Sequence, residues 1–225
     1  PEDHIEPSPY DPTATLFVGF DFNVSPGVAI LCQERRYRGD NPKADRTEDV
    51  TCCIDEIWIE QNSNTRKVCA ELLRRYGAHE GEVWVYADAS GASGHSSQTS
   101  GSDLDLIEKC LNPVFGSRTI SDAGGVVMTY RSRLTMDVPA SNPAVRVRIN
   151  SVNARLRAVD GTIRTRIDPK CQRLIRDFEG VQYKKGTGDI DKAGAPDLSH
   201  LSDAFGYYCH RRHPMTEDWM IVTQF

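Results

Sequence analysis

Two apolar runs that each reach an aspartate constrain the fold of this chain most. The first run, Leu16–Asn23, contains Asp21, and the second, Val83–Asp88, ends in Asp88 just before a loop of small residues. Short runs rich in valine and aromatic residues favour buried β-strands. A bare carboxylate inside such a strand is strongly disfavoured unless something neutralises its charge. The sequence therefore predicts two buried strands whose aspartates need a positive partner.

A third aspartate points to the same need. Asp203 lies near the start of the last helix-like segment, within His200–Phe205. Hard divalent cations such as Mg²⁺ are bound by carboxylate oxygens and waters, so Asp21, Asp88 and Asp203 are candidate ligands of a metal site. Two of them also have a purely structural interpretation, because aspartate commonly caps helices, as Asp203 would, and opens turns, as Asp88 would.

The order of the remaining segments predicts an α/β fold. We expect a turn at Ser25–Gly27 to join the first two strands, and the charged segment 35–49 to be a long connection. The expected strands cover 16–23, 27–33, 53–60, 82–88, part of 126–138 and 163–167, and the expected helices cover 64–76, 103–111, 142–158, 170–179 and 198–211. Three strands, then a helix, a strand and further helices match a ribonuclease H-like core, which is a mixed β-sheet flanked by helices.

The length of the chain is enough for one domain with a sizeable core, at 225 residues. Residues 1–15 are rich in proline and acidic residues and are predicted to be a linker or domain boundary, which leaves 16–225 as the folded domain. The sequence lacks the Gly-x-x-x-x-Gly-Lys-Ser/Thr pattern of a phosphate-binding loop. We therefore expect no motor of that kind within it.

Charge is distributed unevenly along the chain. The net charge is −5, yet residues 126–185 contain 13 Lys or Arg and five acidic residues, a local balance of +8. Such asymmetry is typical of a protein that presents one basic surface to a polyanion. Solvated basic helices are the alternative explanation.

The cysteines indicate the cellular compartment. Seven occur without any Cys-x-x-Cys pair, which favours reduced, buried thiols over a disulfide framework. A zinc site built from Cys52, Cys53 and a histidine is a weaker alternative. With no signal peptide and no apolar run of membrane-spanning length, the sequence predicts a soluble intracellular protein that does not contact a membrane.

Several short motifs occur in an order that resembles the nuclease domain of large terminase subunits, the motor-nucleases that package DNA into tailed-phage and related viral capsids. No single motif is diagnostic, but their common order is fairly specific and spans residues 16 to 208. The matching segments are Gly19–Asn23 with Pro26–Gly27, Tyr86–Gly91, Asn150–Leu156, Leu174–Glu179 and His200–Ala204.

The resemblance implies a fold in which the first strand lies beside the fourth and the final helix packs across both, bringing Asp21, Asp88 and Asp203 together. It implies a metal-dependent endonuclease that cuts concatemeric double-stranded DNA, with these aspartates as catalytic residues and as ligands of two Mg²⁺ or Mn²⁺ ions. It also implies action in the host cytoplasm. The implied partners of the full-length protein are an N-terminal ATPase domain, a small terminase subunit and a portal.

Further residues complete the predicted site. Asn23 and His200 are candidates to orient water or metal ligands. Contacts to DNA phosphates fix position without reading sequence, and the candidates for them are Arg146, Arg155, Lys184 and Lys185.

Three other functions remain open. Another ribonuclease H-like nuclease, of the resolvase or integrase kind, would use the same carboxylates, although the Asn-x-x-Asn motif at 150–153 and the Asp-Phe-Glu segment at 177–179 favour a terminase. An actin-like nucleotide-binding module would repeat its phosphate loop in a second half, and the sequence shows no internal repeat. A non-catalytic DNA-binding module would not need all three aspartates.

Overall fold

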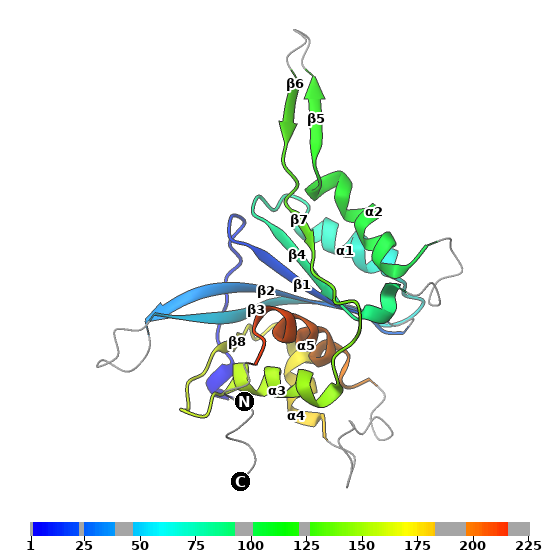
Figure 1. The fold of residues 1–225 in the computed structure, drawn as a ribbon. Coiled ribbons are helices and arrows are strands. Elements are labelled where there is room, and N and C mark those ends of the chain that lie inside the picture. The colour runs from blue at the N-terminus through cyan, green and yellow to red at the C-terminus, as the bar shows by residue number, and fades with distance from the viewer. Residues whose placement is uncertain are drawn as a thin grey trace.

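The computed structural model describes residues 2–22, 25–38, 47–92, 101–121, 127–182 and 197–215. Its centre is a mixed six-stranded sheet with the strand order β7-β4-β1-β2-β3-β8, and a separate two-stranded sheet, β5-β6, projects from the body (Figure 1). The strands are β1 (Leu16–Asp21), β2 (Gly27–Arg38), β3 (Thr47–Ile59), β4 (Val83–Ala87), β5 (Arg118–Ser121), β6 (Val127–Tyr130), β7 (Leu134–Met136) and β8 (Thr165–Ile167). The helices are α1 (Thr65–Tyr76), α2 (Asp103–Phe115), α3 (Val145–Leu156), α4 (Gln172–Gly180) and α5 (His200–Arg212), with the 3₁₀ turns η1 (Glu2–His4) and η2 (Ala89–Ala92). The predicted ribonuclease H-like α/β fold is confirmed.

Strand β1 lies in the middle of the sheet. It pairs in parallel with β4, where Phe20 lies opposite Ala87, and antiparallel with β2. Successive side chains of a strand point to opposite faces, so Val18 packs with α1 and α2 whereas Phe17 packs with α5. By the same alternation, Asp21 belongs to the α5 face.

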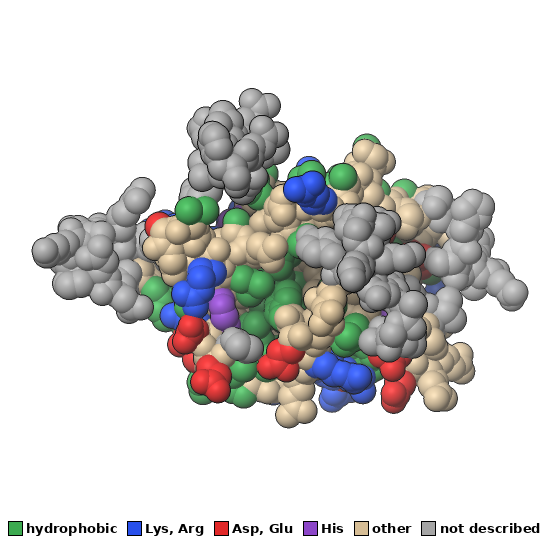
Figure 2. Space-filling view, turned by 90° about the horizontal axis from the view of Figure 1, so that it is seen from below, with side chains coloured by type: hydrophobic (Ala, Val, Ile, Leu, Met, Phe, Trp, Pro, Cys, Tyr) green, Lys and Arg blue, Asp and Glu red, His purple; other side chains and the backbone are tan. Residues whose placement is uncertain are grey.

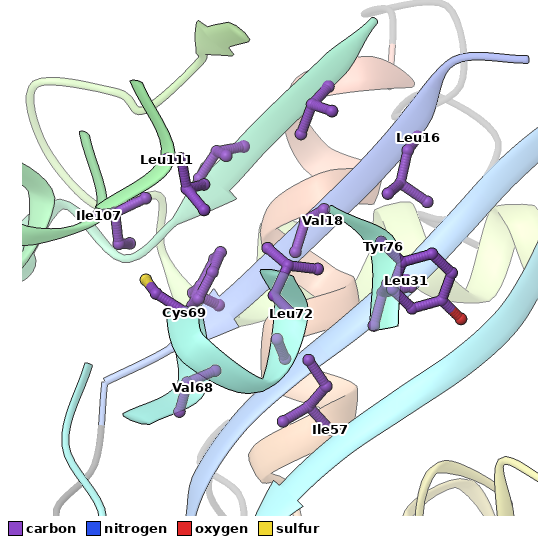
Figure 3. Close-up of a cluster of buried hydrophobic side chains, with 14 of the residues drawn as sticks. Leu16, Val18, Leu31, Ile57, Val68, Cys69, Leu72, Tyr76, Ile107 and Leu111 are labelled. Carbon is purple, nitrogen blue, oxygen red and sulfur yellow. The ribbon is translucent and has the colours of Figure 1, made fainter. Parts of the chain in front are cut away.

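Helices cover both faces of the sheet. On one face, Val68 and Leu72 of α1 join Ile107 and Leu111 of α2 in one apolar core with the strands (Figure 3). The side chain of Asn64 caps the start of α1, in agreement with the predicted helix 64–76. Helices α3, α4 and α5 lie on the opposite face (Figure 1).

Helix α5 packs very close to β1. A Cβ atom added to Gly19 would lie 2.4 Å from the carbonyl oxygen of Ala204, so only glycine allows this approach. The contact fixes the helix over β1 two residues before Asp21. Helix α5 also packs against β4, so the predicted packing of the last helix across the first and fourth strands is confirmed.

Strands β2 and β3 are longer than predicted. Their pairing continues to Arg36 opposite Asp49 and beyond, and the Nε atom of Arg36 lies 3.4 Å from Oδ1 of Asp49. The prediction that 35–49 is a connection is wrong at both ends, because opposite charges on facing strands allow a polar segment to pair as sheet. Residues 39–46 lie outside the described ranges.

The segment 126–138 contains two strands where one weak strand was predicted. Strand β6 pairs with β5 as a projecting hairpin, and β7 pairs in parallel with β4. Helix α2 also runs further than predicted, to Phe115, with Pro113 inside it. The pairing of β7 with β4 depends on a partner that is distant in sequence, which a local pattern does not reveal.

The N-terminal segment packs against the domain. Ile5 forms a bridge to Ile167 of β8, and the ring of Tyr10 lies edge-on to that of Tyr76, with 5.0 Å between centroids. The boundary proposed at residue 15 remains a prediction, and the described residues before it contribute contacts to the fold.

The cysteines are free thiols, as predicted, and six of the seven are buried. Cys32 and Cys53 face each other across β2 and β3, with their Sγ atoms 3.7 Å apart. Among the helices in the described ranges, none combines the length and apolar character needed to cross a bilayer.

Candidate active site

The two strand aspartates lie at the same end of the sheet. Strands β1 and β4 run parallel, and their last paired residues, Phe20 and Ala87, are each followed by an aspartate. Asp21 and Asp88 therefore leave neighbouring strands at one edge. Asp203 lies on α5, which packs against both strands.

Asp88 is held by three hydrogen bonds. Its Oδ1 accepts from Nδ2 of Asn142 and from the backbone N–H of Ser90, both at 2.6 Å, and its Oδ2 accepts from the Tyr207 hydroxyl at 2.7 Å. Burial alone would raise the pKa of Asp88, but the bonds from Asn142, Ser90 and Tyr207 outweigh it and lower that pKa below its ordinary value. Asp88 is therefore ionised and oriented at neutral pH, as a cation ligand has to be.

Asp21 contacts the first residue of α5. Its Oδ2 lies 3.0 Å from Nδ1 of His200, and the two side chains are only 13% and 12% exposed. The ring of Trp58 stands edge-on to that of His200, with centroids 6.2 Å apart. This contact is compatible with the predicted role of His200 in orienting a ligand, which stays a prediction.

Asp203 forms a buried ion pair with Arg148 of α3. The Nη2 of Arg148 donates to Oδ1 of Asp203 at 2.7 Å, and its Nη1 donates to the backbone carbonyl of Asp203 at 3.1 Å. The two side chains are 8% and 10% exposed. The guanidinium carbon also lies 4.4 Å from the centroid of the Tyr207 ring.

Tyr207 holds Asp88 from the helix that also carries Asp203. It lies one turn after Asp203 on α5, and its hydroxyl donates to Asp88. Burial raises the pKa of Tyr207 well above its ordinary value; the charge of Arg148 opposes this rise, whereas the hydrogen bond to Asp88 and the charges of Asp88 and Asp21 add to it. The hydroxyl therefore remains a donor, and it lies within electrostatic reach of both strand carboxylates.

Asp177 of α4 fixes the start of α5. Its buried Oδ2 accepts from the backbone N–H groups of Leu201 at 3.0 Å and Ser202 at 2.9 Å, which are among the groups that a helix N-terminus leaves unpaired. Ser199, just before the helix, has a φ of 82° and makes no side-chain cap. Asp177 therefore replaces the missing cap and orients the helix that carries His200 and Tyr207.

The three carboxylates are the oxygen donors that a hard divalent cation takes. In the ranges that the structure describes, no three His, Cys, Asp or Glu side chains lie close enough together to hold one ion. Both oxygens of Asp88 accept hydrogen bonds, and one oxygen of Asp203 is bonded to Arg148. The residues fit such a cation in chemistry, provided that these partners share or release the carboxylate oxygens.

The predicted DNA-contacting arginines of α3 have different surroundings. Arg146 is exposed. Arg155 is buried, and its Nη2 donates to the carbonyl of Asp49 at 2.8 Å and to the hydroxyl of Thr51 at 2.9 Å. The phosphate contact of Arg155 stays a prediction, while its present contacts support β3.

Two arginines of 126–185 meet acidic groups of the N-terminal segment. Arg157 lies 2.7 Å from Asp3, and Arg166 lies 3.5 Å from Glu6. On the face seen in Figure 2, basic and acidic side chains are interspersed around hydrophobic ones. The local balance of +8 is therefore partly neutralised where the segment docks.

Three predicted site residues, Asn23, Lys184 and Lys185, lie outside the described ranges. Their roles remain predictions.

The sequence reasoning missed two residues that hold Asp88. Tyr207 follows Asp203 by four residues and so lies on the same face of the helix. This spacing could have identified Tyr207 from the sequence. Asn142 gave no such signal, because its bond to Asp88 joins residues 54 positions apart.

No protein-family model matches the sequence, and no curated protein matches it. Among solved structures, the fold is similar to two crystal forms of the large terminase from the thermophilic bacteriophage D6E, each with a TM-score of 0.56 and 15% sequence identity. The match covers 93% of this chain and 42% of that chain, so this chain spans less than half the length of the phage protein. The human cytomegalovirus terminase nuclease domain (Mn soaked) is also similar, with a TM-score of 0.44 and 8% identity over 92% of this chain and 85% of that chain. At 15% identity, the likeness to the phage protein shows a shared fold.

Proposed function

We propose that this chain is the divalent-metal-dependent endonuclease domain of a phage terminase large subunit, and that it cleaves concatemeric double-stranded DNA during genome packaging. The observation that carries the proposal is that Asp21 and Asp88 end neighbouring parallel strands, and that Tyr207, on the helix that also carries Asp203, donates a hydrogen bond to Asp88. The fold shared with a phage large terminase supports the same function.

The proposed chemistry is phosphodiester hydrolysis. It needs a deprotonated water and stabilisation of charge on the attacking and leaving oxygens, and two bound Mg²⁺ or Mn²⁺ ions would supply both. The chain itself holds the carboxylates: Asp21 ends β1, Asp88 directly follows β4, and α5 carries Asp203. Asn142 and Tyr207 fix the orientation of Asp88, and the lowered pKa of Asp88 keeps it charged.

DNA would be held through its phosphates. Arg146 is exposed on the first turn of α3, and we propose it as a phosphate contact, together with the less accessible Arg155 and with Lys184 and Lys185. Because phosphate contacts carry no sequence information, cleavage is expected to be independent of sequence.

The proposal also covers where the full-length protein acts and which components it acts with. We propose that the domain acts in the host cytoplasm together with an N-terminal ATPase domain, a small terminase subunit and a portal. The fold similarity to part of a longer phage terminase supports this setting.

The test is cleavage of plasmid DNA in Mg²⁺ or Mn²⁺, with and without excess EDTA. We expect metal-dependent nicking, and a loss of at least about a hundredfold in Asp88→Asn, because even residues that only orient a metal ligand cost about 10–100-fold when changed. Asp160→Asn, in an exposed turn, is the matched control and should cleave as the wild type does.

Two outcomes would contradict the proposal: cleavage that persists unchanged in EDTA, or wild-type cleavage by Asp88→Asn. A branched DNA junction serves as a comparison substrate. Strong preference for the junction over plain duplex would indicate a resolvase-type enzyme instead.

A further inference from the structure

Arg148 places a permanent positive charge inside an acidic site. A guanidinium is not deprotonated in proteins, and this one is buried together with the carboxylate of Asp203. Its two Nη atoms bond the carboxylate and the backbone carbonyl of the same residue. Both terminal nitrogens of Arg148 therefore bond Asp203.

Helix α5 is shaped to receive this side chain. A Cβ atom on Gly206 would lie 2.9 Å from Cγ of Arg148, so the glycine leaves room for the stem of the arginine. The ring of Tyr207 provides a face for the guanidinium at 4.4 Å, a favourable geometry for a cation over an aromatic ring. Two consecutive residues of α5 thus hold Arg148 against Asp203, and the second of them also holds Asp88.

The charge balance of the site explains why such an arginine is useful. Carboxylates that share a site repel one another when all are ionised, and a buried charge without a partner is strongly unfavourable. Arg148 removes this problem for Asp203 in the absence of any metal. A divalent cation that binds the same carboxylate, however, has to approach a fixed positive charge.

We propose that Arg148 is the built-in counter-cation of the site: it neutralises Asp203 in the metal-free protein and opposes the binding of a divalent cation there. This inference rests on the proposed metal-dependent function. Arg148 is then a positioning residue that sets the concentration of divalent cation at which the site is half-saturated.

The test is the thermal melting of the wild type, Arg148→Met and Arg146→Met in EDTA and across a Mn²⁺ titration. Methionine keeps a long, flexible stem without charge, and Arg146 is an exposed position on the same helix. Arg148→Met should melt below the wild type in EDTA, because Asp203 loses its buried ion pair with Arg148. Its melting temperature should then rise at an Mn²⁺ concentration at least about tenfold lower, since removing a nearby positive charge strengthens the binding of a cation. Arg146→Met should behave as the wild type in both respects.

A half-saturating Mn²⁺ concentration in Arg148→Met that is equal to or higher than in the wild type would overturn the inference while leaving the proposed nuclease intact. If Mn²⁺ shifts none of the proteins, the proposed metal-dependent function fails. Melting of Arg148→Met in EDTA at or above the wild-type temperature also overturns the inference, whatever Mn²⁺ does. Arg148→Gln, which removes the charge but keeps a donor for Asp203, carries the same expectations should the methionine variant not fold.

Discussion

Removing the carboxylate of Asp177 should destabilise the protein through the helix that carries the site. In Asp177→Ala, the N–H groups of Leu201 and Ser202 lose their acceptor. A buried donor left without a partner costs about 1–3 kcal/mol. Leu201 is fully buried whereas Ser202 is partly exposed, so the total should be about 2–5 kcal/mol.

The assay is urea unfolding at neutral pH, with Glu179→Ala as the matched control because it is exposed on the same helix. The midpoint of Asp177→Ala should fall with little change in the slope, as expected for a change in stability alone. A loss of less than 1 kcal/mol, about the smallest cost expected for one unpaired donor, or an equal loss in Glu179→Ala, would refute the capping role.

The pH dependence gives a second check on Asp177. Burial raises the pKa of Asp177, although hydrogen bonds from Ser202, Ser199 and Leu201 and the charge of His200 work against the rise. A carboxyl whose folded pKa is raised contributes stability below its unfolded pKa, and this contribution is lost as pH rises through the folded pKa. The stability of the wild type relative to Asp177→Asn should therefore decline from about pH 4 upward. A difference that grows with pH would contradict the assignment.

Further changes have separate expected results. Tyr207→Phe removes a donor to Asp88 and should raise the pKa of that carboxyl, measured by NMR titration in EDTA, and slow cleavage by about 10–100-fold; an unchanged pKa would refute the contact. Gly19→Ala should displace α5 and cost about 1–3 kcal/mol of stability, and unchanged urea unfolding would show that the helix can move away freely. Leu72→Ala should cost about 2–5 kcal/mol but leave the Mn²⁺ requirement of cleavage unaltered, and a changed requirement would contradict the separation of core and site. Arg146→Ala should lower the slope of log affinity for DNA against log salt by about 0.9, and an unchanged slope would remove it from the DNA contacts.

Local sequence patterns predicted the strands that carry the site, because an apolar run ending in a carboxylate is visible within a few residues. Asp88 was placed correctly where β4 ends, whereas Asp21, predicted inside a strand, is the last residue of β1. The extension of β2 and β3 was not predicted, since it depends on cross-strand pairs such as Arg36 with Asp49, whose charges look like a loop in sequence alone.

The arginines of α3 show a different limit. Arg148 and Arg155 are seven residues apart and therefore lie on one helical face, and that face is buried. A count of basic residues indicated a DNA-facing helix, but it did not identify which face α5 and β3 would cover. Asn142 was not predicted for a related reason. Its hydrogen bond to Asp88 joins residues that are distant in sequence and meet only in the folded chain.

A crystal structure of the protein in Mn²⁺, at a concentration that supports cleavage, tests the central claim most directly. We predict one or two anomalous peaks bound by carboxylate oxygens of Asp21, Asp88 and Asp203, at distances of about 2.0–2.6 Å. We also expect a contact between Arg148 and Asp203 that is longer than the present 2.7 Å. Manganese bound elsewhere, with these three carboxylates left in their present hydrogen bonds, would contradict the claim.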